Sequence, residues 1–262
     1  MELANKVVFV TGGGGGIGAG IAEAFVENGA KVIIADIALA RAEAEAAKYG
    51  ENALAIPIDV TSLDSWASAR KAALARFGQV DVLCNNAGIS IDWELLADIE
   101  PEVFDSAMQI NVYGVYNGVR TFARDMIARG YGHICNTCSA NGLIAPGMMA
   151  TYSATKFAVK GMTDALRAEL APHGVTVSAV YPGRTRSFMS TSSRGRYTAA
   201  IMTKPMNFME PIWVGRAIAA AVENGRKHVI SHPDLKFAVQ AVFDEVLADF
   251  GEPAQPGYKP YD

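Results

Sequence analysis

The sequence has few cysteines, no long apolar run and no excess of positive charge. Its 262 residues include 3 cysteines, and 27 aspartates and glutamates outnumber 23 lysines and arginines, which gives a formal net charge of −4. Proteins that bind nucleic acid or anionic membranes carry basic patches, and a membrane-spanning helix needs about 20 consecutive apolar residues. We therefore expect neither nucleic acid nor a membrane as a partner.

The first residues also lack the pattern of a secretory signal. A four-residue apolar run, residues 7–10, leads directly into glycines. A signal peptide has a longer apolar core and a small-residue cleavage site. We expect a cytoplasmic protein.

Two of the three cysteines, Cys135 and Cys138, form a CxxC pattern. They lie in a predicted strand, where residues at an odd offset face opposite sides of the sheet. No second Cys/His pair completes a metal site. We expect buried thiols and no metal.

Short apolar runs alternate with helical patterns along almost the whole chain. The predicted strands are residues 6–11, 31–36, 53–59, 80–85, 133–139, 176–181 and 227–231. The predicted helices are residues 18–28, 38–48, 63–77, 101–129, 151–171, 211–224 and 235–250. Alternation of this kind predicts parallel βαβ units. We expect an α/β protein with one doubly wound, seven-stranded parallel sheet, helices on both faces and a single domain over residues 1–262.

Two segments interrupt this alternation. Residues 184–210 lack a clear period, and long segments of that kind are commonly functional lids. We predict a substrate-binding lid over residues 183–212. Residues 251–262 contain three prolines, which predict an extended tail.

A glycine-rich run, residues 11–18, follows the first strand and opens the first helix. In that context Gly12 permits a tight turn, Gly16 lets the backbone approach a pyrophosphate, and Gly18 allows close packing of the helix on the strand. The helix N-terminus then offers free N–H groups to phosphates. The alternative is a flexible glycine turn without a ligand.

The second strand ends in Asp36, 18 residues after Gly18. A carboxylate there accepts hydrogen bonds from an adenosine ribose and repels a 2′-phosphate. The glycine loop has no lysine or arginine, and we interpret Arg41 as a solvated helix residue. NAD is therefore favoured over NADP, although an acidic strand-end cap is the alternative.

Further polar residues follow the third and fourth strands. Asp59 and Val60 stand at the end of the third strand, where a side chain could reach the adenine, and residues 85–88 read Asn-Asn-Ala-Gly at the end of the fourth. Doubly wound sheets bind ligands at the carboxyl ends of their strands. We expect these residues to line one crevice, although each could be ordinary turn chemistry.

Tyr152 and Lys156 stand at the start of a predicted helix. The i, i+4 spacing puts both side chains on one helix face. Free tyrosine has a pKa of about 10, and a nearby ammonium favours the phenolate. Tyr-x-x-x-Lys is also a common surface pair, so a catalytic role needs support from further residues.

Ser139 and Asn111 provide this support. Ser139 ends the fifth predicted strand, 13 residues before Tyr152, so its hydroxyl could bind a substrate oxygen at the same sheet edge. Asn111 lies inside the predicted helix 101–129, where an asparagine does not serve as a helix cap or a turn residue. A turn-capping serine and a surface amide are the alternatives.

These motifs, in this order, resemble the short-chain dehydrogenase/reductase family in its compact one-domain branch, which has a Rossmann fold. The resemblance covers residues 5 to 188 and implies a catalytic tetrad of Asn111, Ser139, Tyr152 and Lys156. It implies that Tyr152 is the general acid/base, that Ser139 steadies the substrate oxygen and that Lys156 lowers the tyrosine pKa and binds the nicotinamide ribose. It also implies that Asn111 holds a water that relays protons.

The resemblance extends to the cofactor site. The expected NAD-binding residues are Gly12, Gly16, Ile17, Gly18, Asp36, Asp59, Val60, Asn86, Ala87, Gly88, Tyr152, Lys156, Pro182, Gly183, Thr185 and Ser187. The sequence departs from the family pattern after Pro182-Gly183, where Thr185 and Ser187 replace the usual aliphatic-threonine pair. Ser187 keeps a hydroxyl, so we expect nicotinamide binding to persist with altered detail.

The expected substrate is a small-molecule alcohol or ketone, and the expected substrate-binding residues are Ser139, Asn141, Met148, Met149, Tyr152, Phe188 and Met189. Methionine and aromatic side chains suit a bulky apolar ligand, although single methionines also fill core gaps. The predicted function is NAD-dependent interconversion of a secondary alcohol and a ketone. The alternatives are an NADPH-dependent carbonyl or 3-oxoacyl reductase, an isomerase or epimerase on the same scaffold, and a non-enzymatic NAD-sensing or scaffold protein. By analogy with the family we expect a homo-oligomer, a tetramer or a dimer.

Overall fold

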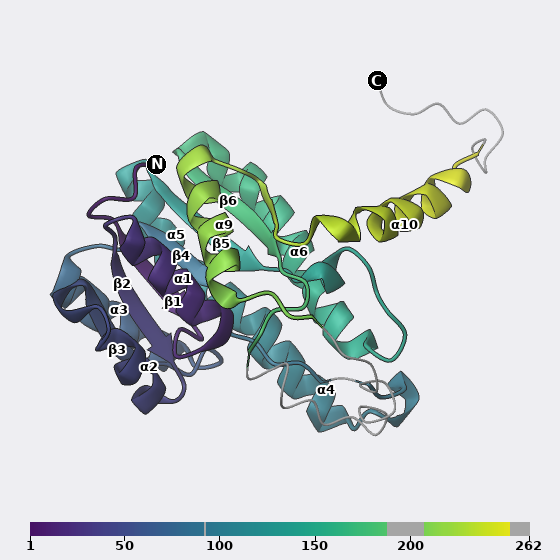
Figure 1. The fold of residues 1–262 in the computed structure, drawn as a ribbon, viewed down its shortest axis with the longest axis horizontal. Helices are drawn as coiled ribbons and strands as arrows, with labels where there is room; N and C mark the ends of the chain where they lie inside the picture. The colour runs from purple at the N-terminus through teal and green to yellow at the C-terminus, as the bar shows by residue number, and fades with distance from the viewer. Residues whose placement is uncertain (92, 188–206, 252–262) are drawn as a thin grey trace. The chain divides into compact units, whose positions relative to one another are not determined.

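The computed structural model describes residues 1–91, 93–187 and 207–251. They fall into two units, residues 1–232 and 233–262. The first unit contains one parallel sheet with the strand order β3-β2-β1-β4-β5-β6-β7 (Figure 1). The predicted doubly wound, seven-stranded α/β sheet is confirmed.

The strands lie close to their predicted positions. They are β1 (Val7–Thr11), β2 (Lys31–Asp36), β3 (Ala53–Pro57), β4 (Val82–Asn85), β5 (Gly132–Thr137), β6 (Val175–Tyr181) and β7 (His228–Ile230). The helices of the first unit are α1 (Gly16–Glu27), α2 (Leu39–Ala46), α3 (Leu63–Phe77), α4 (Pro101–Met108), α5 (Gly114–Arg129), α6 (Ala150–Leu170) and α9 (Pro211–Asn224). Order reversal at β1 and β4 opens the crevice in which such sheets bind ligands.

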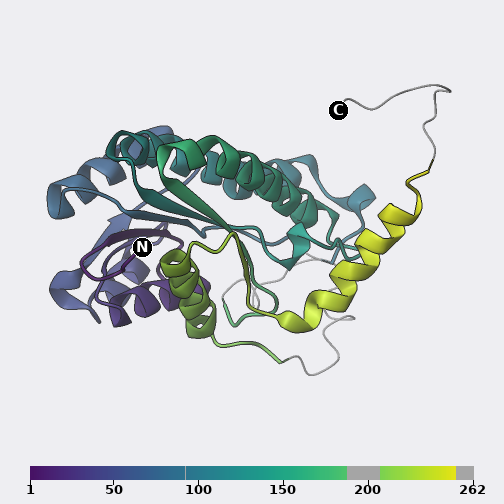
Figure 2. The same cartoon turned by 90° about the horizontal axis from the view of Figure 1, so that it is seen from above.

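Both faces of the sheet are covered, as Figure 2 shows, with α1 and α9 on one side and α5 and α6 on the other. The side chains of β1 alternate between two apolar clusters. Val8 and Val10 pack with α1 and α9, whereas Val7 and Phe9 pack with α3 and α5. Burial on both faces explains why the strand runs are continuously apolar rather than alternating.

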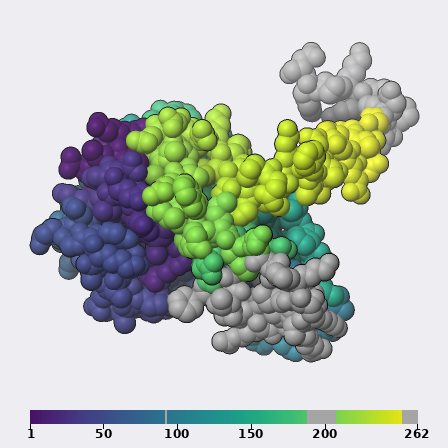
Figure 3. Space-filling view, viewed as in Figure 1, coloured from purple at the N-terminus to yellow at the C-terminus, as the bar shows by residue number. Residues whose placement is uncertain are grey.

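Helices α1 and α9, far apart in the chain, lie side by side at the surface in Figure 3. Their contact depends on two glycines. A Cβ placed on Gly215 would lie 1.9 Å from the carbonyl oxygen of Gly20, and one on Gly20 would lie 2.4 Å from the backbone of Pro211. The two helix backbones therefore touch without intervening side chains.

The expected helix 101–129 is present over its whole length, but it contains an irregular turn. A π-helical turn, η3 (Gln109–Tyr113), lies between α4 and α5. Single π turns inside helices are frequent at functional sites. Asn111 lies in this turn and is fully buried, so a polar side chain directed into the protein interrupts the regular helix.

The cysteines are buried, as predicted. Cys84 and Cys135 lie in the cluster under α1 and α9, and Cys138 lies in the cluster under α6. All three are buried and free. Burial raises the pKa of the Cys138 thiol to about 11, and among the described residues no group of three metal-ligating side chains occurs.

The second unit contains α10 (Lys236–Ala248), which lies within the predicted helix 235–250. Residues 252–262, most of the predicted tail, lie outside the described residues, and the single domain over residues 1–262 stays a prediction. None of the helices within the described ranges is long and apolar enough to cross a membrane.

The α1–α9 contact predicts the effect of a single methyl group. Gly215→Ala should lower the free energy of unfolding by about 1–3 kcal/mol, because the added Cβ would clash with the backbone of Gly20, which cannot move aside easily. Gly161→Ala is the matched control, since nothing lies within 4 Å of a Cβ there and alanine improves helix propensity by up to about 1 kcal/mol. Urea denaturation of both variants measures the two effects, and equal stabilities would contradict the packing argument.

Candidate active site

Thr11 joins the two halves of the sheet at the point where the strand order reverses. Its Oγ1 accepts hydrogen bonds from the backbone N–H groups of Asn86 (2.9 Å) and Ala87 (3.0 Å) and donates to the carbonyl of Cys84. The Asn86 amide also donates to the carbonyl of Thr11. The glycine loop and the Asn-Asn-Ala-Gly turn are thereby held against each other.

The glycine loop has the shape of a phosphate cradle. Gly12 has a φ of 64°, and a Cβ there would lie 3.0 Å from the Cα of Ala87. A Cβ on Gly18 would lie 2.0 Å from the carbonyl oxygen of Gly12, so only glycine allows this helix–strand approach. The first turn of α1 has no side-chain cap and no acidic residue, which leaves its N–H groups for an anion. These features fit the diphosphate of a dinucleotide.

Asp36 is buried at the end of β2, beside this loop. Its Oδ2 accepts from the N–H of Gly14 (3.1 Å) and its Oδ1 from the N–H of Ala38 (2.9 Å). Arg41 is not a purely solvated helix residue, as we had interpreted it, because its Nη2 lies 3.4 Å from Asp36 Oδ1. The first turns of α2 bring the guanidinium back over the strand end, which the linear sequence does not show.

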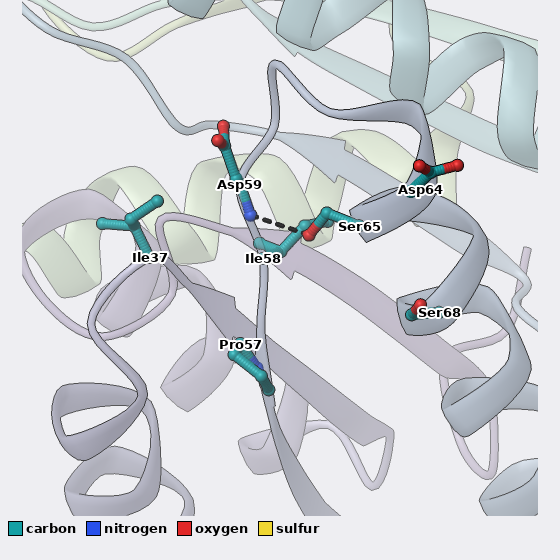
Figure 4. A pocket seen from close by; sticks show the side chains of 7 residues that line it. All are labelled: Ile37, Pro57, Ile58, Asp59, Asp64, Ser65 and Ser68. Carbon is teal, nitrogen blue, oxygen red and sulfur yellow. Dashed lines mark hydrogen bonds between the residues drawn. The ribbon is translucent and has the colours of Figure 1, made fainter.

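A pocket of about 460 Å³ lies at the ends of β2 and β3 (Figure 4). Ile37, Pro57, Ile58, Asp59, Asp64, Ser65 and Ser68 line it. Asp59 is oriented by Thr61, whose N–H and hydroxyl both donate to its Oδ1. The Val60 carbonyl accepts from the indole of Trp66 and the amide of Asn117. Of the two predicted adenine residues, Asp59 lines this pocket and Val60 does not.

The π turn gives Asn111 partners on two other elements. Its Nδ2 donates to the carbonyl of Ile89 (2.9 Å) and to the hydroxyl of Thr155 (3.1 Å), and its Oδ1 accepts from the N–H of Ile89 (2.8 Å). Thr155 in turn donates to the carbonyl of Tyr152. Thr155 was not predicted, because nothing in its sequence context distinguishes it from other helix residues.

Lys156 is buried beside Tyr152. Its Nζ donates to the carbonyl of Thr137 (3.0 Å) and lies 5.4 Å from the centre of the Tyr152 ring. Burial lowers the pKa of Lys156 to about 8, so most of the amine is protonated at pH 7. A Cβ on Gly88 would lie 2.9 Å from Asn111 Oδ1 and 3.6 Å from Lys156 Nζ. The structure therefore brings the turn after β4 together with both of these predicted catalytic side chains.

Ser139 lies beyond the end of β5 with a φ of 59°, a conformation that non-glycine residues rarely adopt. Its hydroxyl accepts from the N–H of Asn141 (3.3 Å), and the Asn141 amide donates to Ser153 Oγ (3.2 Å), next to Tyr152. This chain of bonds connects the Ser139 segment to the first turns of α6. The Asn141 amide also donates to the sulfur of Met149 at 3.6 Å.

The Pro182-Gly183 turn is anchored by a residue whose role the sequence did not reveal. The N–H of Gly183 donates to His232 Nδ1 (3.0 Å), and the other ring nitrogen lies 3.2 Å from the carbonyl of Arg184. Thr185 is buried and pairs with Met209. A Cβ on Gly16 would lie 2.8 Å from the Cβ of Ser187, so the segment after this turn meets the glycine loop.

The predicted substrate residues are described in part. Met148 has a φ of 65°, and its carbonyl accepts from the N–H of Trp93. Phe188 and Met189, with most of the predicted lid, lie outside the described residues. At the described ends of the lid, Arg186 forms an exposed ion pair with Glu210. This ion pair with Glu210 on the protein surface explains the position of Arg186, and no contact with a substrate is needed to explain it.

Comparisons with known proteins agree with this geometry. The profile of the short chain dehydrogenase family matches residues 6–197. A 3-alpha-(or 20-beta)-hydroxysteroid dehydrogenase of Mycobacterium bovis is 36% identical over 189 residues, 72% of either chain. A galactitol 2-dehydrogenase of Agrobacterium fabrum is 39% identical over 184 residues, 70% of this chain and 72% of the relative. A solved short chain dehydrogenase/reductase of Burkholderia phymatum in complex with NAD is 25% identical, has a TM-score of 0.87 and is matched over 97% of this chain and 99% of its own.

A seven-stranded parallel sheet with helices on both faces and a glycine-rich turn at the point of order reversal is a Rossmann-type fold. With the family profile covering residues 6–197, the chain belongs to the short chain dehydrogenase family and is an oxidoreductase of that family.

Buried Lys156 predicts a pH dependence of stability. Its pKa is about 8 in the folded chain and 10.5 when unperturbed, so between these values the unfolded chain binds more protons and this group makes stability rise with pH. The free energy of unfolding of the wild type should gain on the order of 1–3 kcal/mol over Lys156→Met from pH 8 to 10.5. Lys71→Met, which removes an exposed lysine on α3, is the control and should follow the wild-type curve. Parallel curves for wild type and Lys156→Met in urea denaturation would contradict the prediction.

Proposed function

We propose that this protein is an NAD-dependent oxidoreductase that interconverts a secondary alcohol and a ketone. The observation that carries the proposal is the buried Lys156 ammonium beside Tyr152, joined through Gly88 and Asn111 to the crevice where a dinucleotide would lie. A buried cation is costly unless it has partners. Thr137 supplies one backbone carbonyl, and an anionic phenolate would be a further partner.

The residues present would hold NAD from end to end. The free N–H groups of α1 would bind the diphosphate, Asp36 the adenosine ribose, and the pocket lined by Asp59, which precedes Val60 in the chain, the adenine. Gly12, Gly16, Ile17 and Gly18 form the loop, Asn86, Ala87 and Gly88 the opposite wall, and Pro182, Gly183, Thr185 and Ser187 the nicotinamide end. When bound, NAD supplies the acceptor of the hydride.

The chain's own residues would handle the proton. Tyr152 Oη takes the proton of the substrate hydroxyl, and the hydroxyl of Ser139 donates a hydrogen bond to the substrate oxygen. Lys156 favours the phenolate form of Tyr152 by its charge. Both amide hydrogens of Asn111 are donated within the protein, so Asn111 would hold a relay water through the remaining lone pair of its Oδ1.

The substrate is proposed to be bulky and apolar. Asn141, Met148 and Met149 stand between Ser139 and Tyr152 in the chain, and thioethers adapt to irregular apolar ligands. The hydroxysteroid dehydrogenase relative supports a bulky apolar alcohol, whereas the galactitol dehydrogenase relative would favour a polar polyol instead. An NADPH-dependent 3-oxoacyl reductase is the second candidate, since a 34% identical relative in Vibrio cholerae is a 3-oxoacyl-[acyl-carrier-protein] reductase.

We also propose a homo-oligomer, a tetramer or a dimer, in the cytoplasm. Tyr113, Tyr116 and Phe157 are large apolar side chains exposed along η3, α5 and α6. Exposed apolar side chains gathered on neighbouring elements mark interaction surfaces. A second copy of the same surface would cover them in an isologous contact.

Removal of the Tyr152 hydroxyl tests the assigned chemistry. Tyr152→Phe should lower kcat by at least about 100-fold, the usual contribution of a positioned acid/base, and change the Kd for NADH far less, because the loop glycines and Asp36 would still bind the rest of the dinucleotide. Tyr131→Phe is the control, because its hydroxyl bonds Gln79 at the opposite end of the sheet. Turnover of a panel of secondary alcohols, followed by NADH absorbance, measures the loss. Undiminished turnover in Tyr152→Phe would refute the role.

The Asp36 carboxylate makes a prediction about the cofactor. The kcat/KM for NAD should exceed that for NADP by at least about tenfold, because a buried carboxylate opposes a 2′-phosphate. Steady-state kinetics with each cofactor at fixed ionic strength gives the ratio. A preference for NADP would favour the second candidate function instead.

A further inference from the structure

His232 follows the last strand of the sheet and contacts a turn far away in the chain. Strand β7 ends at Ile230, and the His232 ring bonds to Gly183, 49 residues earlier. We propose that His232 is a positioning residue for the nicotinamide end of the cofactor, whose ring fixes the Gly183 turn in the conformation that binds NADH. The proposal rests on the proposed dinucleotide binding. It assigns a function to a side chain that takes no part in the proton transfer.

The backbone ladder between β6 and β7 does not extend to this turn. Its last pair is Tyr181 with Ile230. Pro182 comes next and has no N–H group to donate, so the first donor beyond the ladder is the N–H of Gly183. A half-buried N–H that is left without an acceptor costs free energy. The ring of His232 accepts from this N–H in place of a strand carbonyl.

The contacts of His232 define which ring nitrogen carries the hydrogen. The N–H of Gly183 donates to Nδ1 at 3.0 Å, so Nδ1 is an acceptor and the hydrogen of the neutral ring is on Nε2. Nε2 lies 3.2 Å from the carbonyl oxygen of Arg184 and donates to it. The hydroxyl of Ser231, 2.8 Å from Nδ1, is a second donor to that atom. The ring thus bonds to one N–H and one C=O of the same turn.

The ring also packs against the backbone of the turn. A Cβ on Gly183 would lie 2.7 Å from Cγ of His232, so a glycine is needed for the ring to approach this closely. On the side of β5, the carbonyl of Pro182 accepts from the N–H of Ala140, the residue after Ser139, at 2.9 Å. The turn is therefore held from two sides, by the segment that carries Ser139 and by His232.

The turn determines where the residues after it lie. The carbonyl of Arg184 also accepts from the N–H of Met209 at 2.9 Å, and Thr185 is buried. The Cβ of Ser187 would lie 2.8 Å from a Cβ on Gly16 in the glycine loop. Thr185 and Ser187 would bind the nicotinamide, whereas other elements would bind the adenosine half of the cofactor. A loosened turn would therefore weaken the binding of the nicotinamide end and leave the other contacts in place.

Binding of NADH and of ADP-ribose, the part of the cofactor that remains without its nicotinamide, tests the proposal. Isothermal titration calorimetry would give both Kd values for the wild type, His232→Ala, His232→Asn and His232→Gln. His232→Ala should weaken NADH binding roughly tenfold, because the apparent Kd rises as the fraction of molecules with an ordered turn falls. The Kd for ADP-ribose should change less than about twofold. A general loss of structure would weaken both ligands.

The two amide variants separate the position of the acceptor from the size of the side chain. Asparagine places Oδ1 close to the position of Nδ1, so His232→Asn should keep the bond from Gly183 and bind NADH within about threefold of the wild type. Glutamine has its polar atoms one carbon further out, near the position of Nε2, so His232→Gln should bind NADH nearly as weakly as His232→Ala. This comparison remains informative if the alanine variant fails to fold.

His173→Ala is the matched control. It removes an exposed imidazole in η5 (Ala171–His173), before the start of β6, and should leave both Kd values unchanged. Thermal melting of each variant checks that the fold persists. Unchanged NADH binding in His232→Ala, equal losses for NADH and ADP-ribose, or equal NADH affinities of the two amide variants would overturn the role of His232 while leaving dinucleotide binding intact. Failure of the wild type to bind either ligand would instead remove the proposed function and this inference together.

Discussion

The carboxyl edge of the sheet depends on the hydroxyl of Thr11. Where parallel strands end, the next backbone N–H groups have no neighbouring strand to bond, and those that are buried need another hydrogen-bond acceptor. Thr11 accepts two such N–H groups from the turn after β4 and donates to the carbonyl of Cys84. One side chain thereby adds to the β1–β4 pairing and holds the glycine loop against the turn after β4.

The candidate site adds a buried cation to this junction. Desolvation disfavours the Lys156 ammonium and lowers its pKa to about 8. The Thr137 carbonyl offsets part of the cost. The π turn at Asn111 and the unusual φ of Ser139 are further departures from regular geometry in the same region. Such departures are concentrated at active sites and ligand-binding sites, and the surrounding hydrogen bonds hold them in place.

Local patterns predicted most of the scaffold. Apolar runs bounded by glycine and polar residues marked β2 and the helices α3 and α9 to the residue, because propensity and burial point to the same structure there. The helix 101–129 was predicted as continuous because helical spacing persists through residues 109–113. The helix is continuous, but its π turn was not predicted, and Asn111 in that turn contacts Ile89 and Thr155, which are distant in the chain. Arg41 was likewise misinterpreted, because the turn from β2 into α2 sets its distance from Asp36.

The amino-acid sequence by itself determined the fold class, the succession of strands and helices along the chain and the identity of the polar residues at the strand ends. Those properties follow from periodicity and residue type, which are local. Tertiary structure alone decided which backbone groups face Lys156 and Asn111, since carbonyl and N–H groups are the same in every residue. It decided as well that the His232 ring accepts from the N–H of Gly183. It also decided the Arg41–Asp36 contact and the hollow beside Asp59, because proximity between separate elements exists only once the sheet has formed.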